Sequence, residues 1–83
     1  MTETTFLVQQ GTQIAAAIAK KGYQTRYLNA DLIAWEVTGE DNYWTMLTWI
    51  PKPVAQWRFL PVATDDQQQQ LYSILEQTIG GRR

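Results

Sequence analysis

The stretch from residue 32 to residue 59 constrains the fold of this chain most strongly. It holds all four tryptophans of the sequence and contains three segments with the composition of β-strands. Residues 32–38, 43–50 and 56–62 are rich in β-branched and aromatic residues, which strands favour. Residues 39–42 and 51–55 between them carry glycine, asparagine and proline, which turns favour. We therefore predict neighbouring antiparallel strands at the centre of the fold.

A helix is predicted before these strands, over residues 5–21. Its apolar and small residues recur at spacings of three and four positions: Leu7, Gly11, Ile14, Ala15 and Ile18. Gly22 follows it and suits the left-handed position that ends many helices. A glycine on the apolar stripe predicts close approach of the helix to the sheet, or else a break near the helix start.

A second helix is predicted after the strands. Asp65 or Asp66 begins it, and Asp65 with Gln68 has the spacing of a capping box. Its apolar stripe is clear: Leu71, Ile74, Leu75, Thr78 and Ile79. The glutamine run at residues 67–70 then forms the first turns of an amphipathic helix, and Gly80–Gly81 ends it.

Residues 23–28 alternate weakly and predict a short edge strand, joined to the next strand by residues 29–31. The order is thus α-β-β-β-β-α. We predict one domain over residues 1–83, an α+β two-layer sandwich in which both helices cover one face of a four-stranded antiparallel meander. The other face has no element left to cover it.

Counting through the loops predicts the registers, with residue 28 opposite 32 and residue 38 opposite 43. The face predicted to meet the helices holds Tyr23, Thr25, Tyr27, Ile33, Trp35, Val37, Trp44, Met46, Thr48 and Ile50. The opposite face holds Gln24, Arg26, Leu28, Leu32, Ala34, Glu36, Thr38, Tyr43, Thr45, Leu47 and Trp49.

The register of the last strand is open by one residue, and we favour Ile50 opposite Gln56. That choice puts Trp57 and Phe59 beside Leu47 and Trp49, on the uncovered face, whereas the slipped register sends them to the core. The predicted core is Leu7, Ile14, Ile18, Ile33, Trp35, Val37, Trp44, Met46, Leu71, Ile74 and Leu75.

The residue types present offer little for catalysis. Histidine and cysteine are absent, which removes the common nucleophile–base pairs and zinc sites. Glu40–Asp41 reads as a solvated turn and Asp65–Asp66 as a helix cap. Glu36 is predicted to form a cross-strand ion pair with Arg26 or Arg58. We predict no enzyme, no metal site and no cofactor.

Charge and hydropathy limit the partners. The formal net charge is −1, which argues against a generic polyanion binder. No apolar run approaches the roughly 20 residues of a membrane span, and the first residues lack the pattern of a signal peptide. The sequence predicts a soluble, cytoplasmic protein that does not enter a membrane.

The predicted uncovered face is the candidate binding surface. It gathers Tyr43, Leu47, Trp49, Trp57 and Phe59, with Arg26, Arg58 and Glu36 as orienting charges. Buried aromatic anchors dominate protein interfaces. We therefore predict a small protein-binding or regulatory module, such as an inhibitor, a chaperone-like protein or an accessory subunit, that binds a partner or forms a homodimer. The alternative is single-stranded nucleic-acid binding by stacking on the same face.

Several motifs bear on a family. The helix at residues 14–21, then Gly22–Tyr23, Asn42–Tyr43–Trp44 and Gln56–Trp57–Arg58–Phe59, occur in an order that resembles the first half of YbjN-type domains, relatives of type III secretion chaperones. The resemblance covers residues 10–79 and implies a helix, a Gly-Tyr start to the sheet, and a later strand that leads into a helix. The second half of such domains is missing, so their dimer geometry does not carry over. The resemblance implies a protein-binding role.

Overall fold

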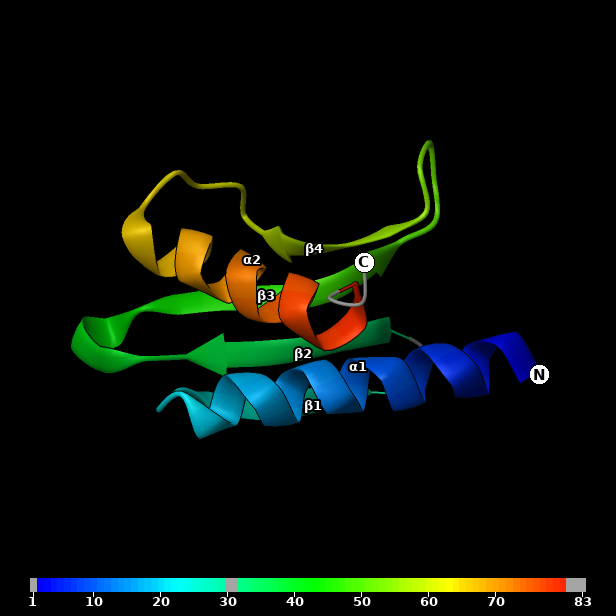
Figure 1. Cartoon of the computed structure of the whole chain (residues 1–83), viewed down its shortest axis with the longest axis horizontal. Helices are drawn as coiled ribbons and strands as arrows, with labels where there is room; N and C mark the ends of the chain where they lie inside the picture. The colour runs from blue at the N-terminus through cyan, green and yellow to red at the C-terminus, as the bar shows by residue number, and fades with distance from the viewer. Residues whose placement is uncertain (1, 30–31, 81–83) are drawn as a thin grey trace.

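The computed structural model describes residues 2–29 and 32–80, without the side chains of residues 2–4, 29 and 32. In order it contains α1 (Thr2–Lys20), β1 (Gln24–Asn29), β2 (Leu32–Thr38), a 3-10 turn η1 (Glu40–Asn42), β3 (Trp44–Ile50), β4 (Gln56–Leu60) and α2 (Asp66–Ile79). The strands form one antiparallel sheet in the order β1-β2-β3-β4, and both helices lie on the same face of it (Figure 1). The predicted α-β-β-β-β-α architecture is confirmed; residues 30–31 of the first strand connection lie outside the described residues.

Helix α1 lies directly on the aromatic rings of the sheet. It is continuous through Gly11, so the predicted close approach is confirmed and the alternative of a break is wrong. A Cβ atom at Gly11 would overlap the Trp35 ring and would lie 2.8 Å from Cη2 of Trp57. Gly22 ends the helix with a φ of 106°, which only glycine adopts without strain.

Two of the three strand registers keep the predicted faces. Arg26 pairs with Glu36 and Tyr27 with Trp35, a shift of two residues that leaves residues 24–27 and 35–38 on their predicted faces. The register then shifts between Tyr27 and Asn29. Ile50 pairs with Gln56, so the favoured register of the last strand is confirmed.

The register between β2 and β3 differs from the prediction by one residue, because Thr38 pairs with Trp44 and not with Tyr43. The connection is one residue longer than predicted and takes in Tyr43. The Gly39 N–H donates to the Tyr43 carbonyl at 3.0 Å, and the Tyr43 N–H donates to the Glu40 carbonyl at 3.1 Å. Asp41 and Asn42 take left-handed φ values of 59° and 64° to close this turn. A one-residue slip exchanges the faces of β3 and, with it, of β4.

The core changes accordingly. Leu47 and Phe59 pair beneath the helices and are fully buried, and Trp57 joins Trp35 there. The core is Leu7, Ile14, Ala15, Ile18, Trp35, Val37, Leu47, Trp57, Phe59, Leu71, Ile74 and Leu75. The prediction that Trp44 and Met46 belong to the core is wrong, because the slip turns both outward. Ile33 packs at the border of the core and is only partly buried.

Helix α2 begins as predicted. The Asp65 carboxylate accepts a hydrogen bond from the Gln68 N–H at 2.7 Å, and the glutamine run forms the first turns of the helix. The side chain of Gln68 does not return the bond to Asp65. It is buried, accepts from the Ala63 N–H at 3.0 Å and donates to the Pro61 carbonyl at 3.1 Å. Gln68 therefore holds the segment between β4 and α2 against the helix.

Candidate binding face

One face of the sheet carries no helix of the described chain. Alternation along the registered strands gives its members, which we call the open face: Gln24, Arg26, Ala34, Glu36, Thr38, Trp44, Met46, Thr48, Ile50, Gln56, Arg58 and Leu60.

The most exposed aromatic ring on the open face is held in place by two charged residues. Trp44 is 46% exposed, and its indole N–H donates to Oε2 of Glu36 at 2.8 Å. The other oxygen, Oε1 of Glu36, accepts from Nη2 and Nε of Arg26 at 2.9 and 3.1 Å. The predicted ion pair of Glu36 is thus formed with Arg26. Since both carboxylate oxygens are engaged, the carboxylate is fixed and fixes the indole in turn.

The electrostatics of this network favour the ionised carboxylate. The hydrogen bond from the Trp44 indole, and then those from Arg26, hold the pKa of Glu36 below its usual value. Because the network lies at the surface, water and salt screen its charges, and its main effect is to orient the ring rather than to stabilise the fold.

Apolar side chains and a further cation share the open face with Trp44. Met46, Ile50 and Leu60 are each partly exposed. Arg58 extends from β4 on the same face, and no carboxylate among the described residues forms an ion pair with it. The open face therefore offers an oriented tryptophan, apolar side chains along β3 and β4, and a positive charge without an ion pair among the described residues.

The structure divides the predicted site residues into two groups. Arg26, Glu36 and Arg58 lie on the open face, where the site was predicted; for Arg58 this results from the slip, because the predicted register would have turned it toward the helices. The prediction that five aromatic or apolar residues share that face is wrong, because the slip between β2 and β3 places them under the helices: Tyr43, Leu47, Trp49, Trp57 and Phe59. Leu47 and Phe59 are fully buried, and the Trp57 indole donates to Gln10 of α1 at 2.9 Å.

The sequence-based assignment missed five residues of the open face: Trp44, Met46, Thr48, Ile50 and Leu60. One signal was present in the sequence. Two alternating sets of residues compete for the helix-covered side of β3 and β4. The set with the larger apolar side chains is Leu47, Trp49, Trp57 and Phe59, and the other is Trp44, Met46, Ile50 and Leu60. Burying the first set under the helices removes more apolar surface from water and is therefore favoured.

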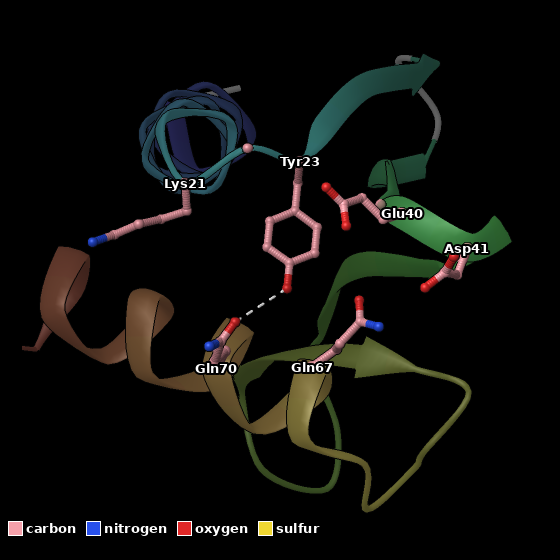
Figure 2. Close-up of a pocket in the computed structure, with 8 residues that line it drawn as sticks. Lys21, Tyr23, Glu40, Asp41, Gln67 and Gln70 are labelled. Carbon is pink, nitrogen blue, oxygen red and sulfur yellow. Dashed lines mark hydrogen bonds between the residues drawn. The ribbon is translucent and has the colours of Figure 1, made fainter.

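A second feature is an open polar pocket of about 310 Å³ at one end of the molecule (Figure 2). It lies between the end of α1, the turn after β2 and the first half of α2, and is lined by Lys21, Tyr23, Glu40, Asp41, Gln67 and Gln70, with Gly22 and Gly39. The Tyr23 hydroxyl donates to Oε1 of Gln70 at 3.4 Å. Burial, and then the charge of Asp65, raise the pKa of Tyr23, so its phenol stays protonated and is a poor base. The pocket contains no nucleophile–base pair.

Next to this pocket, the Tyr43 hydroxyl is buried without a hydrogen-bond partner among the described residues. The Gln68 amide lies beside the hydroxyl but outside hydrogen-bond geometry, and its hydrogen bonds go to Ala63 and Pro61. Burial, and then Asp65, raise the pKa of Tyr43 as well, and the neighbouring Gln68 amide opposes that rise. An unpaired hydroxyl here reduces stability, and we assign it no binding role.

Within the described ranges, no group of three or more acidic or other metal-binding side chains gathers to hold a metal ion. Neither α1 nor α2 has the length and apolar character needed to cross a bilayer, and no other helix of the described chain does. The chain matches no protein-family model, no curated protein and no solved structure. Its resemblance to YbjN-type domains therefore stays a prediction.

Proposed function

We propose that this chain is a small protein-binding module that docks on its partner through the open face, with Trp44 as the anchor. The observation that carries the proposal is the indole of Trp44, half exposed on an uncovered sheet yet fixed by Glu36 and Arg26. Tryptophan is the residue type most enriched among interface hot spots. A ring that is already held in one orientation loses little conformational freedom on binding, which raises affinity.

The remaining face residues specify the chemistry of the partner. Met46 and Leu60 beside Trp44 favour an apolar group, and Arg58 without an ion pair favours a carboxylate within reach of that group. A second copy stacked face to face fits poorly. It would bring another Arg58, while its Glu36 is already engaged by Arg26 and Trp44. The partner is therefore a different protein, one with an acidic and apolar contact segment.

The same arrangement supports protein contact better than stacking of nucleic-acid bases. A stacking surface needs several exposed rings along the strand that it binds. Trp49, Trp57 and Phe59 pack on the helix side, and among the described residues Trp44 is the one aromatic side chain on the open face. Inhibitors, chaperone-like proteins and accessory subunits can all act through such a face, and the cytoplasmic location predicted from the sequence belongs to this proposal.

The test is affinity capture from the cells that make the protein, followed by purification of the captured protein and measurement of its Kd. Trp44→Ala is the test variant. Val54→Ala is the matched control, because Val54 is 60% exposed and lies in the loop outside the face. We expect the purified partner to bind the parent and Val54→Ala alike, and Trp44→Ala at least about 30-fold more weakly, as for a hot spot worth about 2 kcal/mol. Arg58→Glu should weaken binding too, and more at low salt than at high salt. Equal affinity of the partner for the parent and Trp44→Ala would refute the proposal.

A further inference from the structure

The two edges of the sheet are built differently, and the β4 edge is partly blocked. The Phe59 N–H points away from β3 and donates to the Tyr72 hydroxyl of α2 at 3.0 Å. Pro61, directly after β4, has no N–H, which leaves Trp57 as the other outward position of the strand. Such devices prevent another strand from adding to an edge.

The β1 edge has no such protection. Hydrogen-bonding direction alternates along antiparallel strands. The Phe59 N–H points away from β3, and Phe59 is linked by successive strand pairs to Leu47, Trp35 and Tyr27. Applying the alternation at each pair places the N–H and C=O groups of Tyr27 on the outer side of β1. Thr25, two residues earlier, points the same way. No residue of the described chain outside β2 hydrogen-bonds the backbone of β1. A charged side chain often guards an edge, but Arg26 is drawn back over the sheet onto Glu36.

Helix α1 presents a flank of small side chains beside this edge. The rotation of α1 about its own axis is fixed by Gln10, whose side-chain oxygen accepts a hydrogen bond from the indole of Trp57 on β4. On a helix, Val8, Thr12 and Ala19 lie on the side opposite Gln10, and therefore toward β1. Figure 1 shows α1 running along β1, at the side of the molecule away from β4. Thr12 and Ala19 are exposed.

The spacing admits a second copy here. Helix α1 packs against both β1 and β2, so its axis lies over these two strands. A strand added to the β1 edge lies about 4.8 Å away. If it were the β1 of a second copy, with its own α1 in the same place, the two helix axes would be one to three strand spacings apart, about 5–14 Å. That range includes the roughly 8–10 Å at which helices pack together. A lone extended peptide would pair with the edge but leave the α1 flank uncovered.

We propose that β1 pairs antiparallel with β1 of a second copy, and that the two α1 helices pack together across the same two-fold axis. This surface is separate from the open face, so the inference goes beyond the proposed function. Two four-stranded sheets become one, with both open faces on the same side. Two Trp44 anchors then act together on one partner, or on a partner with two binding segments, and gain avidity without new contacts.

Thr12 is the position that tests the dimer. Gly11 contacts Trp35, and Trp35 pairs with Tyr27. Thr12, the next residue of α1, therefore lies level with the outward backbone groups of β1. In the proposed dimer it faces Thr12 of the second copy near the two-fold axis. Gln13 is the matched control, because it is exposed on the same helix but points away from the β1 side. The measurement is sedimentation equilibrium of the full chain. We expect the parent and Gln13→Glu at twice the 9.6 kDa chain mass. Thr12→Glu and Thr12→Arg should each dissociate about 100-fold more readily, because each meets a like charge at the axis.

Mixing Thr12→Glu with Thr12→Arg should restore the dimer, a rescue that damage to the fold would not produce. Hydrogen exchange gives a second readout: the Thr25 and Tyr27 amides should be protected in the parent and exchange freely in Thr12→Glu. A parent that stays monomeric at millimolar concentration overturns the proposal, as does a Thr12→Glu variant that dimerises as tightly as the parent. A dimer that Trp44→Glu dissociates while Thr12→Glu leaves it intact places self-association on the open face, and also overturns it.

Discussion

Replacing Gly11 with alanine has two opposing effects on stability, a gain in helix propensity and a loss from overpacking of the core. In a helix interior alanine is favoured over glycine by about 1 kcal/mol, so α1 considered alone predicts stabilisation. The structure predicts the opposite. The added methyl group would overlap the Trp35 ring and lie 2.8 Å from Cη2 of Trp57. Neither ring moves aside easily, because Trp35 is 4% exposed and packs on Tyr27, and the Trp57 indole is bonded to Gln10.

Overpacking a core costs about 1–3 kcal/mol, and two rings are displaced here, so we take the upper value. Subtracting the gain in helix propensity leaves a net loss of about 2 kcal/mol in the free energy of unfolding. For a domain of this size that lowers Tm by about 10 °C. Circular dichroism measures the melting curve, and the near-ultraviolet signal of the tryptophans should change as well.

The control is Ala16→Gly, the reverse exchange at an exposed position of the same helix. It should lose about 1 kcal/mol through propensity alone and leave the near-ultraviolet signal as in the parent. If Gly11→Ala melts at or above the parent temperature, α1 does not lie on these rings, and the packing described here is incorrect.

Three further predictions test the faces, the network and the cap. Leu47→Ala should lower the free energy of unfolding in urea by about 2–5 kcal/mol, whereas its neighbour Met46→Ala on the open face should lower it by about 1 kcal/mol; equal losses would contradict the register between β2 and β3. The pKa of Glu36 is lower in the folded state than in the unfolded state. The ionised carboxylate therefore contributes fully to folding stability above the usual pKa of about 4.3. That contribution is lost as the pH falls through the lowered pKa of the folded state. The indole N–H resonance of Trp44 should therefore shift with a midpoint below the usual pKa of a glutamate, and Glu36→Gln should remove that step. Asp65→Ala should cost about 1 kcal/mol in urea through loss of the helix cap, and an unchanged midpoint would show that the cap contributes nothing.

Local chemistry made most of the fold predictable. The bounds of β2, the start of α2 at Asp65 and the left-handed Gly22 follow from neighbouring residues alone. Gly11 was informative for the same reason, because a glycine on an apolar stripe has few explanations other than close packing. These signals act within a few residues and do not depend on the rest of the chain.

The composition of the open face was not predictable by the same means. It depends on whether Tyr43 belongs to the turn or to β3, and that depends on Asp41 and Asn42 both adopting left-handed conformations. Turn residues permit this geometry without requiring it. Packing against α1 and α2 decides it, because the register that buries Leu47 with Phe59 removes the most apolar surface from water.

We propose the open face, with Trp44 fixed by Glu36, as the surface that binds a partner. The most direct measurement is a two-dimensional NMR titration of the labelled chain with the purified captured protein. We predict that the Trp44 indole resonance and the amides of Glu36, Met46 and Arg58 shift together, while those of α1 and α2 stay in place. Shifts confined to the helices, with the Trp44 indole unmoved at saturation, would contradict the account.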